Sequence, residues 1–176
     1  MNKYKHNKLA TFLFNMLLNC SKFLMKHIWL YYLLNCTWGI LMTLIGWIVT
    51  LALLIAGKKP EKFGPIYCFK IKPSWGGFET GLMFVRDTTS TEYVSYHELG
   101  HTFQNAIMGP FQVFIIFIPS AIRYWYRYLK YDRKNISAPT DYDAIWFEDS
   151  ASTIGQAYKL YKDELQKWKR HKEITR

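Results

Sequence analysis

The feature that most limits how this chain can fold is a long stretch without a charged side chain, from Ile28 to Ala56. It exceeds the ~20 apolar residues that a helix needs to cross about 30 Å of hydrocarbon. Trp29 stands near one end and Lys58-Lys59 follow the other, as residues at the two interfaces of a bilayer do. The stretch therefore predicts a transmembrane helix. The alternative is a buried helix or helical hairpin of a soluble protein.

The residues before this stretch allow more than one interpretation. Leu9 to Met25 is apolar with a few polar residues, which fits an in-plane amphipathic helix or a second, weaker span. Lysines followed by an apolar run are also typical of a secretory signal, but Asn19 before Cys20 does not fit a lipoprotein cleavage site, and we expect no cleavage. We predict an N-terminal amphipathic or transmembrane anchor over residues 1–57 and a second domain over 58–176.

The positive charge of the chain points to a membrane surface rather than to nucleic acid. The formal net charge is +10, and no motif that reads bases accompanies it. The basic residues stand beside the apolar segments, at Lys22, Lys26, Lys58, Lys59, Arg123 and Arg127. Basic side chains next to apolar segments favour contact with anionic lipid head groups. The predicted partner is a lipid bilayer, and the predicted location is a cell membrane, with no nucleic-acid partner.

The three cysteines, Cys20, Cys36 and Cys68, form no CxxC pair. Two of them lie in apolar stretches, where cysteine behaves as a small hydrophobic residue. The sequence therefore predicts neither a disulfide framework nor a cysteine metal ligand.

The rest of the chain predicts an α+β fold that is mainly helical. Two β-prone runs, 66–71 and 78–85, flank turn residues at 73–77, which indicates a β-hairpin. Thr89 and Glu92 have the spacing of a capping box, so a helix should begin there and end at Gly109-Pro110. A short apolar helix over 111–122 should be kinked by Pro119, and a charged last helix should begin near Thr140 or Asp141.

One motif carries chemistry: His97-Glu98-Leu99-Gly100-His101, inside the helix that follows the hairpin. Residues four apart share a helix face, so both imidazoles can bind one metal ion. Glu98 emerges beside them and can take a proton from metal-bound water. A bare HExxH also occurs by chance, but this one lies in a well-marked amphipathic helix. We therefore predict a Zn²⁺ site with His97 and His101 as ligands and Glu98 as general base.

A third protein ligand must come from elsewhere. The downstream candidates are Asp141, Asp143, Glu148, Asp149 and His171. Glu148 stands in the most apolar part of the last helix, where a carboxylate is costly unless it is paired or binds a metal. The alternative is that Glu148 and Asp149 only stabilise the positive N-terminal end of that helix. We favour Glu148 as the ligand.

HELGH, followed about fifty residues later by a helical glutamate with small residues after it, resembles the gluzincin metallopeptidases. The match is closer to small bacterial membrane proteins of that type. It extends over most of residues 38–158 and includes Thr43-Leu44-Ile45-Gly46, Trp75-Gly76-Gly77, Gly81, His97 to Gln104, Gly109-Pro110, Pro119-Ser120, Trp146-Phe147-Glu148, Ala151 and Gly155. The resemblance implies a zincin-like fold, the ligands His97, His101 and Glu148, and Glu98 as general base.

The sequence departs from this resemblance at one position. Related sequences commonly carry an aspartate four residues after the third-ligand glutamate, where it can orient a metal-bound histidine. This chain has Ser152 there, and a hydroxyl holds a histidine N–H more weakly than a carboxylate does. Asp149 is the other candidate for this role, although it faces about 100° away on a helix.

The predicted function is a membrane-anchored zinc metallopeptidase that hydrolyses peptides or proteins near the membrane surface, with residues 78–86 as the substrate rim. The alternative is a zinc-binding membrane protein of the same fold that acts in binding or assembly without turnover. Ser152 favours this alternative and Glu98 opposes it, because a structural zinc site needs no base. An intramembrane protease is disfavoured, since polar residues such as Thr91 and Glu92 precede the motif.

Overall fold

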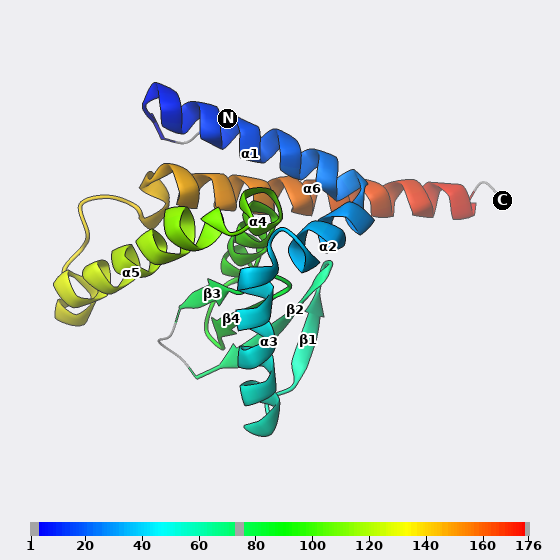
Figure 1. The fold of residues 1–176 in the computed structure, drawn as a ribbon. Helices are drawn as coiled ribbons and strands as arrows, with labels where there is room; N and C mark the ends of the chain where they lie inside the picture. Colours follow the sequence, from blue (N-terminus) through cyan, green and yellow to red (C-terminus); the bar gives the residue numbers. More distant parts are fainter. Residues whose placement is uncertain (1–3, 73–75, 175–176) are drawn as a thin grey trace.

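In a computed structural model, which describes residues 4–72 and 76–174, the protein is mostly helical with a small four-stranded sheet (Figure 1). The elements are α1 (Lys8–Lys26), α2 (Ile28–Cys36), α3 (Ile40–Ile55), β1 (Pro60–Phe63), β2 (Ile66–Ile71), β3 (Gly77–Glu79), β4 (Met83–Asp87), α4 (Glu92–Met108), the π-helical turn η1 (Val113–Phe117), α5 (Ile118–Lys130), the 3₁₀ turns η2 (Asp132–Lys134) and η3 (Tyr142–Ala144), and α6 (Trp146–Ile174). The broad prediction of a mainly helical α+β chain is confirmed.

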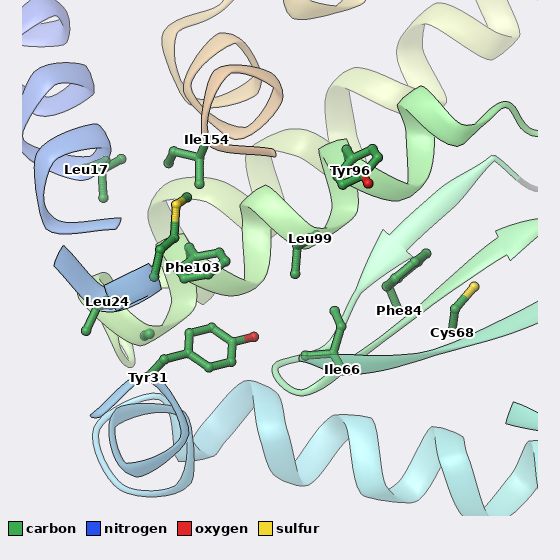
Figure 2. Packing of buried hydrophobic residues seen from close by; sticks show 12 residues of the cluster. Leu17, Leu24, Tyr31, Ile66, Cys68, Phe84, Tyr96, Leu99, Phe103 and Ile154 are labelled. Atoms are coloured by element: carbon green, nitrogen blue, oxygen red, sulfur yellow. The ribbon is translucent and has the colours of Figure 1, made fainter. Parts of the chain in front are cut away.

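Helix α4 lies at the centre of the fold, between the α1–α6 layer and the sheet (Figures 1 and 2). Its side chains Leu99 and Phe103 are fully buried in one hydrophobic cluster. The cluster also contains Leu17 from α1, Tyr31 from α2 and Ile154 from α6. Residues on both sides of the predicted boundary at 57/58 therefore contribute to the same core.

The sheet has the order β1-β2-β4-β3, and its pairing corrects the predicted hairpin. Strand β2 pairs with β4 in parallel, with Cys68 opposite Phe84. The predicted run 78–85 divides instead into β3 and β4, which pair antiparallel through a tight turn at Thr80-Gly81. Gly81 has a φ of +73°, a conformation that favours glycine and permits the reversal. Residues 73–75 of the predicted turn lie outside the described residues. Strand β3 is left at the edge of the sheet.

The predicted transmembrane helix over residues 28–56 is wrong. Helices α2 and α3 form within this stretch, but they meet at 83°, and no single helix in the described ranges is long and apolar enough to cross a membrane. A buried amide contact holds the corner: Asn105 Nδ2 of α4 donates to Asn35 Oδ1 at 2.7 Å and to the Gly39 carbonyl at 3.1 Å. Periodicity and apolarity cannot reveal this bend, because its cause lies in another helix.

The first half of α3 is packed against the β3–β4 turn, and the second half is packed on one side only. A Cβ on Gly46 would lie 2.2 Å from the Thr80 carbonyl oxygen, and a Cβ on Gly81 would lie 2.4 Å from Thr43 Oγ1. The two chain segments therefore touch through backbone at the β3–β4 turn. Beyond Gly46, Val49 and Leu53 pack against the cluster of Phe69, Met83 and Val85, while Trp47, Ile48, Leu51, Leu54 and Ile55 are exposed.

The ends of the central helix are partly as predicted. Helix α4 begins after Thr91 rather than Thr89, because the Thr89 hydroxyl and amide both donate to Asp87 Oδ1 at 2.8 Å. The predicted capping box is therefore wrong. The helix ends at Gly109, as predicted, with a φ of +58°.

The outer helices differ from the predictions in detail. Helix α1 buries Phe14, Leu17 and Leu24 on one face, which agrees with the amphipathic alternative. Pro119 lies in the first turn of α5 and follows the π-helical turn. Helix α6 begins at Trp146, several residues later than predicted, because the chain first makes the turn η3.

Candidate metal centre

The site is built where α4 crosses α6, and two glycines allow the crossing to be unusually close. A Cβ on Gly100 would lie 1.9 Å from the Ala151 carbonyl oxygen, and a Cβ on Gly155 would lie 1.9 Å from the Tyr96 carbonyl oxygen. Each helix thus presses its glycine against the backbone of the other. This contact brings Glu148, at the start of α6, over the two histidines of α4.

The structure brings His97, His101 and Glu148 together. Glu148 Oε2 lies 3.1 Å from His97 Nε2 and 3.2 Å from His101 Nε2, and the two Nε2 atoms are 3.1 Å apart. One ligand atom from each residue lies within 4.8 Å of the others, and all three side chains are buried. This buried group can hold a metal ion, and it contains the three ligands predicted from the sequence.

The electrostatics of the group fit a cation. Burial raises the pKa of Glu148, but hydrogen bonds from His101 and His97 outweigh burial and hold it well below its usual range. Burial lowers the pKa of each histidine, and the Glu148 carboxylate more than compensates, so both are raised. Glu148 Oε1 is buried and has no hydrogen-bond partner among the described residues. Two imidazole nitrogens that face each other beside a carboxylate with a free oxygen form a donor set suited to zinc.

The far nitrogen of His101 is held by Gln104. His101 Nδ1 lies 2.7 Å from Gln104 Oε1, and Gln104 Nε2 donates to the Phe147 carbonyl at 2.8 Å and to Ser150 Oγ at 2.7 Å. These acceptors fix the orientation of the amide, so its oxygen is left to accept the His101 Nδ1–H. Gln104 was not among the site residues predicted from the sequence. Its spacing of three residues from His101 is the signal that was available.

The two residues considered for orienting a histidine lie in different places. Ser152 Oγ is 2.7 Å from His97 Nδ1. Asp149 lies away from both histidines of the motif, and its Oδ2 is 2.9 Å from His6 Nε2 in a buried pair. The structure therefore brings Ser152 to the site, while Asp149 links the segment before α1 to α6 through His6.

Glu98 lies between the histidines and the edge strand β3. Burial raises the pKa of its carboxyl to about 8, and the charges of Glu148 and Glu79 act in the same direction against the opposing effect of His101. A Cβ on Gly77 would lie 2.4 Å from Glu98 Oε1, so the absence of a side chain at Gly77 leaves room for the carboxyl. A carboxyl that exchanges its proton near neutral pH is suited to acid–base catalysis.

A cavity of about 470 Å³ opens beside these residues. Its walls are largely apolar and come from β3, α4, η1, α5 and η3, including Phe78, Val94, Ile116, Phe117 and Trp125. His97, Glu98 and His101 lie in its wall as well. The candidate metal centre therefore faces a space that is large enough for a side chain or a short peptide segment.

Two further polar groups in the cavity wall were not found from the sequence. Burial raises the pKa of Glu79, whose Oε2 accepts from the Gly81 amide at 2.7 Å and whose Oε1 accepts from Gln112 at 3.1 Å. Burial also raises the pKa of Tyr142, which therefore keeps its phenolic proton, and its hydroxyl lies 3.1 Å from Ser120 Oγ. Neither residue belongs to a motif, so only the fold reveals them.

The other candidates for a third ligand are not part of the triad. Asp141 accepts a hydrogen bond from Tyr4 at 2.6 Å, and Asp143 lines the cavity. The side chain of His171 lies outside the described residues.

Comparisons of the chain with protein-family models, with curated proteins and with solved structures give no match.

Proposed function

We propose that this protein is a zinc-dependent hydrolase of peptide bonds. The observation that carries the proposal is the convergence of His97, His101 and Glu148 on one buried point, with Glu98 next to it and a cavity in front of it. A site that only holds a metal for stability needs no base and no cavity. Two histidines with one carboxylate leave a fourth position on a tetrahedral ion for water or substrate, which is the arrangement of catalytic rather than structural zinc.

The residues of the chain divide the chemistry among them. When bound, zinc lowers the pKa of its water to about 7 and polarises a carbonyl oxygen. Glu98 takes the proton from the attacking water and delivers it to the departing amine. Tyr142 keeps its proton and lines the same cavity, so its hydroxyl is placed to donate a hydrogen bond to the oxygen on which negative charge develops.

The substrate in this proposal is an extended peptide that lies along β3. Strand β3 is at the edge of the sheet, and its Gly77 lies directly against Glu98. An edge strand can add a peptide through main-chain hydrogen bonds, which positions the scissile bond without reading its sequence. The rim is then residues 77–79 rather than the predicted 78–86, because β4 already pairs on both sides. The apolar cavity favours a large apolar side chain next to the cleaved bond.

The deciding experiment measures metal content and cleavage on the same preparations. Wild type should carry about one zinc per chain, and His97→Ala and Glu148→Ala should lose it. Glu98→Gln should keep the metal but lose about 10²- to 10⁴-fold in the rate of cleavage of fluorogenic peptides with large apolar residues. Glu92→Gln, at the exposed start of the same helix, is the matched control and should change neither.

Two results would contradict the proposal in different ways. A wild-type protein that binds no zinc when zinc is supplied would leave no metal site. A protein that binds zinc but cleaves peptides no faster than Glu98→Gln would favour the second candidate, a binding or assembly protein without turnover.

We further propose that the protein works at a lipid surface, on which it docks through the exposed apolar sides of α3 and α5. Helix α3 has no charged residue, and beyond its packed half Leu51 is 61% and Ile55 80% exposed. Helix α5 presents a second apolar stripe at the spacing of an amphipathic helix: Ile118, Ile122, Trp125 and Leu129 are all exposed. Exposed apolar surface of this extent needs an apolar partner.

Charge favours a bilayer over a second copy of the chain. Lys58, Lys59 and Lys62 are exposed just after the apolar half of α3. Two chains of net charge +10 repel each other, whereas anionic head groups attract such a surface. The α5 stripe lies on the helix that also lines the cavity, so docking would place the site beside the lipid surface.

Vesicle flotation tests the docking. Wild type should float with phosphatidylcholine vesicles that contain phosphatidylglycerol, and less with phosphatidylcholine alone. Leu51→Glu and Ile122→Glu should reduce flotation, while Leu160→Glu, an equally exposed leucine on α6, should not. A wild-type protein that ignores both vesicles, or forms a dimer that Leu51→Glu dissociates, would overturn the lipid assignment.

A further inference from the structure

We infer that Asp143 is a positioning residue for the metal centre and acts on His97 through the hydroxyl of Ser152. This inference rests on the proposed metal site and goes beyond it, because it assigns a role to a carboxylate that is not a ligand. Ser152 Oγ lies 2.7 Å from His97 Nδ1 and donates to Asp143 Oδ2 at 2.8 Å. The three groups form a chain from the edge of the cavity to the metal ligand.

A serine hydroxyl alone does not determine which nitrogen of a neighbouring histidine carries the proton. A hydroxyl can donate one hydrogen bond and accept two. If Ser152 donated to His97 Nδ1, the imidazole would have to carry its proton on Nε2, which is the nitrogen that faces Glu148 and the metal position. That tautomer cannot bind a metal through Nε2. A serine in this position therefore needs a further group that takes its proton.

Asp143 supplies that group. An ionised carboxylate only accepts hydrogen bonds, so Oδ2 takes the Ser152 hydroxyl proton and leaves the oxygen lone pairs of Ser152 to face His97. Tyr93 donates its hydroxyl to the same Oδ2, which agrees with an acceptor at this atom. His97 must then donate from Nδ1, and its Nε2 lone pair points to the metal position. The carboxylate thus fixes the tautomer of His97 although it does not touch it.

The fold explains how an aspartate before Glu148 can do this. Asp143 lies in the turn η3, which precedes α6, while Ser152 lies in the second turn of α6 after Glu148. The turn folds back so that Asp143 reaches along the helix to a residue nine positions later. The carboxylate that the sequence lacks at position 152 is therefore supplied from position 143, with one hydroxyl between.

A double-mutant cycle on metal affinity tests the chain of contacts. Zinc affinity is measured by competition with a chromophoric chelator for wild type, Asp143→Asn, Ser152→Ala and the double variant. Each single change should lower the affinity about tenfold or more. The double variant should be no weaker than Ser152→Ala alone, because without the hydroxyl Asp143 has no route to His97. Asp141→Asn, two residues away and exposed, is the control and should have no effect.

A rescue variant separates positioning from a structural role of Asp143. Ser152→Asp places a carboxylate directly at the histidine, so Asp143→Asn in this background should cause no loss of zinc affinity. If Asp143 served only to hold the turn η3, its replacement would cost the same factor in every background, and that result would overturn the inference. No loss in the single variant would overturn it as well.

A spectroscopic signature gives a second readout. In the Co²⁺-loaded protein, the Nδ1 proton of His97 is an exchangeable, paramagnetically shifted resonance. Asp143→Asn should speed its exchange with solvent, because the Ser152 hydroxyl is then free to turn. The failure of the proposed function can be distinguished from the failure of this inference. A protein that shows the expected double-mutant cycle in zinc affinity but cleaves no peptide would support the positioning role and contradict the peptidase. A protein that binds neither Zn²⁺ nor Co²⁺ would contradict both the positioning role and the peptidase.

Discussion

In helices α4 and α3 of this protein, burial does not follow the hydrophobicity of the sequence. Helix α4 has polar and charged residues in its sequence, yet it lies at the centre of the fold with His97, Glu98 and His101 buried. Helix α3 has no charged residue, yet one side of its second half is exposed, with Leu51 61% and Ile55 80% exposed. Hydrophobicity alone would assign the two helices the wrong way round.

The difference lies in the partners that each helix finds. Several polar groups of α4 are hydrogen-bonded: His101 to Gln104, Gln104 to the backbone of α6, and the amide nitrogen of Asn105 to Asn35. Buried polar groups are tolerated when their hydrogen bonds are made. Beyond Gly46, α3 is packed on one side only, where Val49 and Leu53 contact Phe69, Met83 and Val85 of the sheet. Burial follows from specific contacts, and the apolar surface of α3 remains for another partner.

The largest expected effect comes from truncating one leucine in each helix. Leu99→Ala removes a side chain that is 0% exposed in the central cluster and should lower the free energy of unfolding by about 2–5 kcal/mol. Leu51→Ala, at 61% exposure, should change it by no more than about 0.5 kcal/mol. Urea unfolding of both variants checks this. Equal losses would mean that α3 is packed in solution.

The second prediction sharpens the comparison at the α4–α6 crossing. An alanine in place of a helical glycine ordinarily stabilises a helix by about 1 kcal/mol. Gly155→Ala should instead destabilise by about 1–3 kcal/mol and weaken zinc binding, because its Cβ would strike the Tyr96 carbonyl. Thermal unfolding and chelator competition measure both effects, with Leu160→Ala on the exposed face of α6 as control. A stabilised variant would show that the helices can separate freely.

The third prediction concerns the amide that holds His101. Gln104→Ala should lower zinc affinity by about 10- to 100-fold, because the histidine loses the acceptor at Nδ1. Affinity is measured by chelator competition, together with the metal-free stability. Gln112→Ala is the comparison, because the Gln112 amide donates to Glu79 at 3.1 Å and to the backbone carbonyl of His101 at 3.4 Å rather than to a ligand side chain. A similar loss of affinity in both variants would count against a specific role for Gln104.

The smallest effect is a pH dependence of stability that belongs to Glu79. Burial raises the native pKa of this carboxyl above its ordinary 4.5, so the native state binds the proton more tightly than the unfolded chain does. The contribution of Glu79 to the free energy of unfolding should therefore be fully present below pH 4.5 and be lost as the pH rises through the native pKa. Glu79→Gln should remove this part of the slope in urea titrations of zinc-free protein, whereas exposed Glu92→Gln should not. Parallel slopes in wild type and Glu79→Gln would contradict it.

The sequence predicted those parts of the site that a single element encodes. His97, Glu98 and His101 share a helix face, and Glu148 stood out as a carboxylate in apolar surroundings. Gly109 ended the helix as expected. Gln104, Tyr142 and Glu79 were missed because each becomes part of the site only through contacts with other elements.

The errors in the fold have the same origin. The stretch from 28 to 56 has the length and composition of a span, but a buried contact between Asn35 and Asn105 bends it, and residue types alone do not predict which asparagines will meet. Phe78 and Val85 fit one β-prone run, but the turn at Gly81 divides it and the parallel pairing of β2 with β4 reverses the expected topology.

The contact of Thr43 and Gly46 with the β3–β4 turn has a mechanical consequence. The first half of helix α3 contacts Thr80 and Gly81 backbone to backbone. Beyond this contact, Val49 and Leu53 of α3 pack against the sheet residues Phe69, Met83 and Val85, while Leu51 and Ile55 remain exposed. Because packed backbone yields little, we expect α3, the β3–β4 turn and β3, whose Gly77 lies against Glu98, to shift together rather than separately. A partner that binds the exposed side of α3 would therefore act on the strand that lies next to Glu98.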